Sequence, residues 1–269
     1  MTDADVVLQG GGSNVIGLVS AAYELRRKVR IARVAGTSAG GLAAVALAFG
    51  VDPVVLRSTL ERVLQGNQLL DGDLAAFLTR FGWCRGDALR RTVRQLVGEG
   101  TRMGDALTPV AVVVGDLYMR APRVLSSWAT PNVLVEDAAV ATAAIPGVFA
   151  AQEVRGLGVG NRLHVDGGVT MNFALDLFDD EPERMTIGLR PDDADDGQLR
   201  PVRDLKAYVW AIAALRQWSA NNAYGSKKSR VVVVDVPGGD GLDFSLSVGE
   251  IARRWNAGVK AATAASIGG

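Results

Sequence analysis

The pentapeptide Gly36-Thr37-Ser38-Ala39-Gly40 constrains the fold of this chain more than any other segment. It lies between a short apolar run, Ile31–Ala35, and a segment rich in alanine and leucine that begins near Gly40. Glycines two residues before and two residues after Ser38 lack a Cβ atom, so the backbone can turn sharply and leave the hydroxyl exposed. This pattern is typical of a serine nucleophile on a tight turn between a strand and a helix. The helix would also direct the positive end of its dipole toward negative charge that forms near Ser38.

The order of apolar and glycine-rich segments predicts an α/β fold. A short run at Val6–Leu8, a glycine cluster and an amphipathic segment at Val15–Arg27 precede Ile31–Ala35, and such alternation is typical of a parallel sheet covered by helices. Later β-branched runs without polar alternation predict strands buried on both faces, at Val110–Gly115, Arg123–Ser126, Leu163–Val165, Met185–Leu189 and Val231–Val236. Further helices are predicted at Pro53–Gln65, Gly86–Leu96, Val135–Ala144, Val202–Ala223 and Ser247–Ala264. Ser247 and Glu250 form a capping-box pattern at the start of the last helix. We expect a three-layer α/β/α fold with a mainly parallel central sheet, and residues 1–269 as a single domain.

The balance of charge argues against nucleic-acid binding. Lysine plus arginine and aspartate plus glutamate number 29 each among 269 residues, whereas nucleic-acid binders usually carry a basic excess. Acidic stretches at Asp179–Glu183 and Asp192–Asp196 are interpreted as solvated loops, and Pro191–Pro201 is expected to be a flexible loop.

Cysteine content and hydropathy predict a cytoplasmic protein. Cys84 is the single cysteine, which excludes an intrachain disulfide, and we expect its side chain to pack in the interior. The first five residues lead directly into a strand without the pattern of a secretory signal. The longest apolar run, Gly40–Val51, has 12 residues and is too short to cross a bilayer. Any membrane contact is therefore expected to be peripheral.

Two further motifs provide groups that a serine nucleophile needs. Gly10-Gly11-Gly12 follows the first strand, and glycines there expose backbone N–H groups that can converge on an anion. The triplet does not match a Walker A loop or a dinucleotide fingerprint, but beside a serine turn it can form an oxyanion hole. Asp166-Gly167-Gly168 follows the strand Leu163–Val165, and the glycines allow a second group to approach the carboxylate closely. The alternative is a turn aspartate that binds its own backbone.

In this order and at these separations, the three motifs resemble those of the patatin-like phospholipase family. The similarity covers nearly the whole chain and extends to Ala143–Phe149, to Asn172 and to a C-terminal region with Leu242–Ser247, Gly258 and Lys260–Ala262. The resemblance implies a lipid acyl hydrolase that cleaves fatty-acyl esters, such as those of phospholipids, through an acyl-enzyme, with no cofactor and no metal. It assigns the residues as follows: a catalytic dyad of Ser38 and Asp166, oxyanion N–H donors from Gly10, Gly11 and Gly12, and support of the two turns by Gly36, Gly40, Gly167 and Gly168. Because an aspartate with an ordinary pKa of about 3.9 is a poor base, we expect an apolar, partly dry site in which burial raises that pKa.

The glycine loop departs from the pattern of the family. Four residues, Ser13-Asn14-Val15-Ile16, separate Gly12 from Gly17, where the family usually has two, often including a basic one. The loop is thus longer and contains no lysine or arginine. This difference predicts a mobile or partly misformed oxyanion hole and low basal activity.

The single histidine, His164, is not expected to act as the base. In an extended strand it shares a face with Asp166, two residues on, so it is either a neighbour of the dyad or a neutral, packed histidine. An α/β-hydrolase would use His164 as base with Asp116 as acid, but that fold has several strands before its serine turn and would leave Asp166 without a role.

Two further hypotheses concern binding. Trp83, Trp128, Trp210 and Trp218 suit a membrane interface, so the loops that carry them and the helices after Pro53, which flank the acyl groove in the family, are candidates for membrane contact. The segment Val202–Ala223 is amphipathic and is interpreted mainly as core-facing. The altered glycine loop also leaves open a binding module without catalysis, although Ser38 and Asp166 are present.

Overall fold

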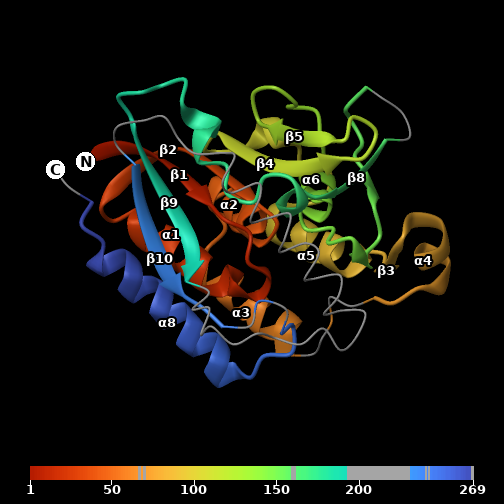
Figure 1. Cartoon of the computed structure of the whole chain (residues 1–269). Coiled ribbons are helices and arrows are strands. Elements are labelled where there is room, and N and C mark those ends of the chain that lie inside the picture. The colour runs from red at the N-terminus through yellow and green to blue at the C-terminus, as the bar shows by residue number, and fades with distance from the viewer. Residues whose placement is uncertain are drawn as a thin grey trace, which may run out of the picture.

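The computed structural model describes residues 1–65, 68, 71–158, 162–192, 231–239, 241 and 243–267. Within these residues the strands are β1 (Thr2–Leu8), β2 (Val29–Thr37), β3 (Gly82–Cys84), β4 (Val110–Asp116), β5 (Ala121–Ser126), β6 (Gly147–Phe149), β7 (Gln152–Glu153), β8 (Leu163–Asp166), β9 (Met185–Asp192) and β10 (Val231–Pro237). The α-helices are α1 (Val15–Leu25), α2 (Ala39–Ala48), α3 (Pro53–Gln65), α4 (Leu74–Arg80), α5 (Asp87–Val97), α6 (Val135–Thr142) and α8 (Val248–Ala264), and short 3-10 helices span η1 (Gly12–Asn14), η2 (Met103–Asp105), η3 (Gly167–Val169) and η4 (Leu175–Phe178). Figure 1 shows their arrangement.

The predicted elements are confirmed wherever the structure describes them. Each predicted strand and helix lies within two or three residues of an observed one, apart from the start of β1, and α3 has the predicted bounds. Ser247 caps α8, because its Oγ accepts a hydrogen bond from the Glu250 N–H at 3.2 Å. The sequence did not predict α4 or the short strands β3, β6 and β7.

Some predictions concern residues outside those described. They are the helix at Val202–Ala223 with Trp210 and Trp218, most of the acidic stretch Asp192–Asp196, and most of the loop Pro191–Pro201. The loop begins later than predicted, because Pro191 and Asp192 still belong to β9 and pair with Val236 and Pro237 of β10.

Among the described residues, eight strands form one mixed, mainly parallel sheet. The order is β10-β9-β1-β2-β4-β8-β7, and β5 pairs with β4. Strands β10, β9, β1, β2 and β4 pair in parallel, whereas β4 pairs with β5 and β8, and β7 with β8, in antiparallel orientation. The α/β fold with a mainly parallel sheet is thus as predicted. A second, two-stranded sheet joins β3 to β6.

The central strands are buried on both faces. In β1, Val6 and Leu8 pack in the larger core cluster with helices α1, α2, α6 and α8, whereas Val7 packs with Phe173 and Phe178 on the opposite face. Because successive strand residues point to opposite faces, a run without polar residues is what such a strand requires. This explains why continuous apolar runs located the strands correctly.

The edge of β4 brings the two candidate motifs together. Strand β5 pairs along Ala111–Asp116, so β2 and β8 share the other edge of β4. Strand β2 occupies the first part of this edge and ends where Thr37 pairs with Val113, and β8 occupies the last part and ends where Asp166 pairs with Val114. The chain therefore delivers Ser38 and Asp166 to neighbouring positions from opposite directions.

We predict that Gly40→Ala lowers the free energy of unfolding by about 3 kcal/mol, as expected for overpacking against a rigid neighbour. A Cβ atom on Gly40 would lie 2.3 Å from the carbonyl oxygen of Leu8, which is backbone of the central sheet. Gly249 in helix α8 provides the control, because a Cβ atom there would meet only the Ser247 hydroxyl, at 3.9 Å. Gly249→Ala should be neutral or stabilise by roughly 0.5 kcal/mol. Urea unfolding of both variants measures the difference, and equal stabilities would contradict the tight packing of the turn.

Candidate active site

Ser38 occupies the sharp turn that the sequence predicts. Its backbone has φ 53° and ψ −126°, a conformation that residues other than glycine rarely adopt, and helix α2 begins at the next residue. A Cβ atom on Gly36 would lie 2.2 Å from the carbonyl oxygen of Gly40, so the turn cannot tolerate a side chain there. Thr142 at the end of α6 fixes the turn: its Oγ1 accepts a hydrogen bond from the Ser38 N–H at 3.0 Å and donates one to the Val113 carbonyl oxygen at 2.5 Å. No sequence pattern predicts this role of Thr142.

The hydroxyl of Ser38 is hydrogen-bonded to the carboxylate of Asp166. The Oγ of Ser38 donates to Oδ2 of Asp166 at 2.5 Å, and both residues are buried, with 7% and 4% of their surface exposed. The Gly168 N–H donates to the other carboxylate oxygen at 2.7 Å. Gly167 lets the turn after Asp166 pack closely on β4, since a Cβ atom there would lie 2.3 Å from the Val113 carbonyl oxygen.

Burial raises the pKa of the Asp166 carboxyl to about 7, although the hydrogen bonds from Ser38 and Gly168 act in the opposite direction. Desolvation disfavours the charged form of an acid. At neutral pH the group is therefore close to the point at which it can accept or release a proton, which is what a general base requires.

The glycine triplet lies against Ser38, but its three N–H groups are not equivalent. The Gly10 N–H donates to the carbonyl oxygen of Asn172 at 3.3 Å, and the Asn172 side chain donates to the Gly10 carbonyl oxygen at 3.3 Å. Among the described residues, no backbone acceptor is found for the N–H groups of Gly11 and Gly12. Gly11 and Gly12 are therefore better placed than Gly10 to donate to an oxyanion, and Asn172 orients the start of the loop.

The two turns are also connected directly. Oγ1 of Thr37 donates a hydrogen bond to the Met171 carbonyl oxygen at 3.0 Å, which links the residue before Ser38 to the segment after Asp166.

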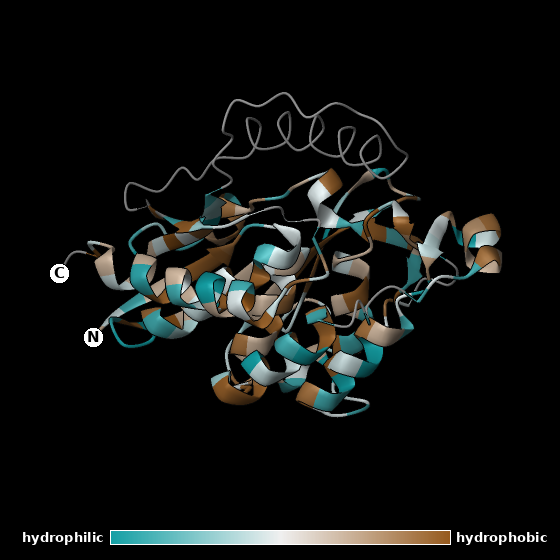
Figure 2. Cartoon of the chain, turned by 90° about the horizontal axis from the view of Figure 1, so that it is seen from below, coloured by the Kyte–Doolittle hydropathy of each residue, from teal (hydrophilic) through white to brown (hydrophobic). Residues whose placement is uncertain are grey.

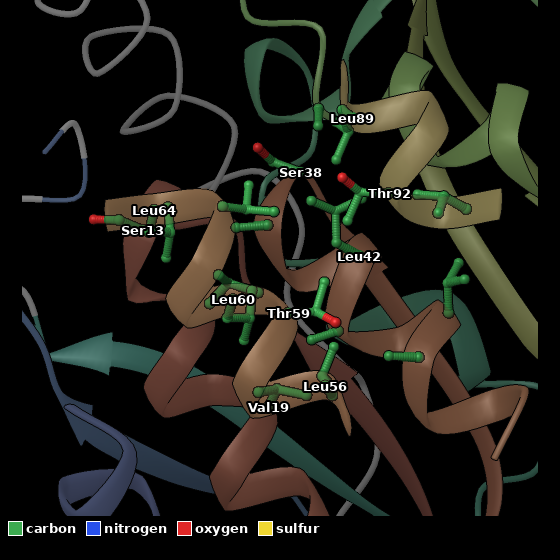
Figure 3. Close-up of a pocket in the computed structure, with 18 of the residues that line it drawn as sticks. Ser13, Val19, Ser38, Leu42, Leu56, Thr59, Leu60, Leu64, Leu89 and Thr92 are labelled. Carbon is green, nitrogen blue, oxygen red and sulfur yellow. The ribbon is translucent and has the colours of Figure 1, made fainter. Parts of the chain in front are cut away.

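An apolar pocket opens beside Ser38. Figure 3 shows Ser38 at one end of it and Val19 and Leu56 at the other, with walls from helices α1, α2, α3 and α5. The side chains labelled along the walls are mainly aliphatic: Leu42, Leu60, Leu64 and Leu89, with Thr59 and Thr92. A smaller, more polar pocket also reaches Ser38 and is lined by the glycine triplet, Asp166, Gly168 and Asn172.

Ion pairs fix helix α5, one wall of the apolar pocket. Arg94 of α5 bonds both carboxylate oxygens of Glu136 at 2.8 and 2.7 Å, and Arg90 pairs with Asp137. Both acids lie on α6 and are almost fully buried. The position of the wall is thus tied to the same helix that supplies Thr142.

His164 is buried in β8 and lies beside Asp116. Its Nε2 lies 3.7 Å from Oδ2 of Asp116, and neither ring nitrogen has a hydrogen-bond partner among the described residues. Burial lowers the pKa of the imidazole despite the nearby Asp116 carboxylate. The histidine and acid of the α/β-hydrolase alternative are therefore neighbours, but the group in contact with the serine hydroxyl is Asp166.

The longer connection after the glycine triplet is packed rather than loose. Ser13 and Asn14 form the end of η1 and are 1% and 3% exposed. Contacts with distant segments, described below, account for this packing, and the mobile or partly misformed oxyanion hole stays a prediction.

Other predicted residues have the following positions. Cys84 is buried, and burial raises the pKa of its thiol to about 11, so it is a packing residue as expected. Asp180 and Glu181 of the first acidic stretch are exposed and lie near Arg33. Among the described residues, no group of three or more histidine, cysteine, aspartate or glutamate side chains is arranged to hold a metal ion, and no helix has the length and hydropathy to span a membrane.

A sequence model of the patatin-like phospholipase family matches residues 6–179, which include the glycine triplet, the Ser38 turn and the Asp166 motif. The chain belongs to the patatin-like phospholipase family. Uncharacterized protein YqhO of Bacillus subtilis is 31% identical over 215 residues, which cover 69% of this chain and 70% of that protein. Membership of this family does not by itself define the reaction of this patatin-like protein, which depends on the groups at its site.

Solved structures of patatin-like fold are similar to this one. VipD from Legionella pneumophila aligns with a TM-score of 0.60 at 15% identity over 97% of this chain, and ExoU in its complex with SpcU from Pseudomonas aeruginosa aligns with a TM-score of 0.50 at 17% identity over 97%. At these identities the similarity shows the fold alone. The patatin-like chain spans 66% and 50% of the length of those two chains.

We predict that Asp166→Asn stabilises the protein at pH 8, by up to about 4 kcal/mol. The pKa of Asp166 is about 7 in the folded state, against an ordinary value of 3.8 for an aspartate, so the folded state binds the proton more tightly. The free energy of unfolding of the wild type therefore falls as pH rises from about 4 to 7. Above pH 7 the whole cost of burying the charged Asp166 carboxylate is present. The advantage of the neutral asparagine should shrink as pH is lowered toward 4.

Urea unfolding at several pH values measures this difference. Asp180→Asn is the control, because that carboxylate is exposed and its ion pair contributes less than about 1 kcal/mol. A stability difference for Asp166→Asn that does not change with pH would contradict the raised pKa.

Proposed function

We propose that this patatin-like protein is a lipid acyl hydrolase that cleaves fatty-acyl esters of phospholipids or similar lipids through a Ser38–Asp166 dyad. The observation that carries the proposal is the 2.5 Å hydrogen bond from the Ser38 hydroxyl to a buried carboxylate at the end of an apolar pocket. We also propose that residues 1–269 form one domain, since one cluster of buried side chains extends from Ala4 to Ala262.

In the proposed mechanism, Asp166 takes the proton of the Ser38 hydroxyl as its oxygen attacks the ester carbonyl. The Gly11 and Gly12 N–H groups stabilise the oxyanion of the tetrahedral intermediate. Asp166 then returns the proton to the leaving alcohol, and the acyl-enzyme forms. Water, activated by the same carboxylate, hydrolyses the acyl-enzyme and regenerates Ser38.

The apolar pocket is the proposed site of the acyl chain. Its aliphatic lining matches a hydrocarbon chain, which gains free energy with each methylene group that leaves water. The more polar pocket beside Asp166 and Asn172 is the side on which the leaving alcohol would lie. Acyl esters fit this division between an apolar and a polar side better than peptides or sugars do.

A membrane surface is the proposed source of the substrate, and an apolar patch of helix α4 and strand β3 is its proposed contact. The patch consists of five side chains that are 40–69% exposed: Leu74, Phe77 and Leu78 of α4, Trp83 of β3, and Phe81 between them. Helix α4 lies at the edge of the molecule in Figure 1, and its residues are mostly apolar in Figure 2. Strand β3 pairs Cys84 with Phe149, which lines the acyl pocket, so the patch is connected to the pocket wall. Aromatic and aliphatic side chains of this kind suit the interface of a bilayer. A cytoplasmic location stays a prediction.

We predict that Ser38→Ala and Asp166→Ala each reduce hydrolysis of a p-nitrophenyl ester by about 10⁴-fold or more, and that the double variant is little worse, because the two groups act as a unit.

For the wild type, kcat/KM should rise with pH through about 7, because Asp166 must be unprotonated to act as a base. His164→Gln, which keeps a buried polar side chain of similar size, should retain most of the activity.

A fluorophosphonate probe distinguishes the alternatives. It should label the wild type and His164→Gln but not Ser38→Ala. A wild type that is folded, unlabelled and inactive would support a binding module without catalysis. If His164→Gln is as inactive as Ser38→Ala, a triad replaces the proposed dyad.

We predict that Leu74→Gln combined with Leu78→Gln weakens sedimentation with phosphatidylcholine vesicles and lowers hydrolysis of vesicle lipid by about 100-fold or more, since burial of each leucine contributes roughly 1.5–3 kcal/mol and about 1.4 kcal/mol is tenfold in affinity. Hydrolysis of a water-soluble ester should not change, because neither side chain lines the pocket. Leu107→Gln is the matched control, as Leu107 is 79% exposed outside the patch. Equal loss in the control variant would contradict the proposed contact.

A further inference from the structure

Arg254 of helix α8 is a charged residue buried beside the glycine loop. It is 3% exposed, whereas its neighbour Arg253 has a side chain that is 55% exposed. A buried guanidinium group is costly unless it is paired and hydrogen-bonded. Its partners therefore indicate what it does.

Two of these partners are the residues that make the glycine loop unusual. Nη1 of Arg254 donates to Oγ of Ser13 at 2.9 Å and to Oδ1 of Asn14 at 3.1 Å. Both contacts join residues about 240 positions apart in the chain. Hydrogen bonds with a charged donor are roughly twice as strong as neutral ones.

A second set of contacts joins the same loop to the segment between β10 and α8. The Asn14 side chain bonds the backbone of Gly239 in both directions, at 2.9 and 3.1 Å, and the Ser13 N–H donates to the Gly241 carbonyl oxygen at 2.8 Å. Gly12 has φ +56°, and a Cβ atom on it would lie 2.0 Å from the Gly241 carbonyl oxygen. The backbone on which the Gly11 and Gly12 N–H groups lie is thus fixed from the C-terminal side.

Glu250 completes the arrangement. It lies one turn before Arg254, and its carboxylate accepts from Nε of Arg254 at 2.8 Å and from both Nε and Nη2 of Arg253. Hydrogen bonds from Arg253 and Arg254 lower the pKa of Glu250 to about 2. Glu250 therefore stays charged and orients the Arg254 guanidinium toward the loop, while Arg253 shares the carboxylate without reaching Ser13 or Asn14.

We propose that Arg254 is a positioning residue for the oxyanion hole. It supplies from helix α8 the positive charge and the anchor that the glycine loop lacks in its own sequence, and it acts through Ser13 and Asn14. This inference rests on the proposed hydrolase function, since it assigns a role within the same site.

The test compares Arg254→Gln, Arg254→Lys and the control Arg253→Gln. Because a shift of about 1 Å in a catalytic group can reduce the rate 10²-fold, Arg254→Gln should lower kcat for a p-nitrophenyl ester by about 10- to 100-fold with KM within about twofold. Arg254→Lys should recover part of the loss. Arg253→Gln should keep kcat within about twofold. An unchanged kcat in Arg254→Gln, or an equal loss in Arg253→Gln, would overturn the proposal.

Hydrogen exchange of a peptide that covers residues 9–18 gives a readout that does not depend on activity. Exchange there should be faster in Arg254→Gln and not in Arg253→Gln, while peptides from β4 and α2 keep their protection. If the wild type hydrolyses no ester, the proposed function fails, and the exchange data still decide whether Arg254 holds the loop. If Arg254→Gln does not fold, Ser13→Ala removes one of the same contacts with a small change. It should lower kcat several-fold at unchanged KM, and full activity of that variant would overturn the proposal.

Discussion

The hydrogen bond between the Ser38 hydroxyl and the Asp166 carboxylate sets the conditions that the rest of the structure meets. It requires a carboxylate to be held 2.5 Å from a hydroxyl in a place with little water. Burial makes this costly, because the charged form loses its solvation. The same burial raises the pKa of Asp166 to about 7 and makes the group a usable base. The cost is offset by rigid neighbours: the shared edge of β4, the Gly168 N–H and the turn that Thr142 fixes.

Much of the fold could be predicted because its signals are local. Strands buried on both faces need continuous apolar runs, and these runs located β1, β4 and β9. The turn at Ser38 needs glycines at fixed positions, because a Cβ atom on Gly36 would clash with the backbone of Gly40 and one on Gly40 with the backbone of Leu8. The two motifs could be joined only through the resemblance to a family, since local patterns do not say that β2 and β8 share one edge of β4.

The structural features that the sequence did not predict depend on contacts between distant segments. Thr142 is an ordinary helical threonine in the sequence, and its role follows from the meeting of α6 with Ser38. Helix α4 has seven residues, and most of its apolar side chains are exposed rather than packed. The helix therefore lacks the repeated apolar face by which the longer helices are recognised. His164 and Asp116 lie 48 positions apart, and only the antiparallel pairing of β4 with β8 makes them neighbours.

The glycine loop shows how one structural requirement can be met in two ways. Ordering two additional residues costs roughly 1–2 kcal/mol each in backbone entropy. Charge-assisted hydrogen bonds contribute about 1.5–3 kcal/mol each, so the two bonds from Arg254 are of the size needed to offset that cost. A basic residue within the loop would stabilise it locally and independently of the C-terminal helix. Under the proposed role of Arg254, the geometry of the oxyanion hole depends on how α8 packs along α1, so the N-terminal motif would need the C-terminal helix in place.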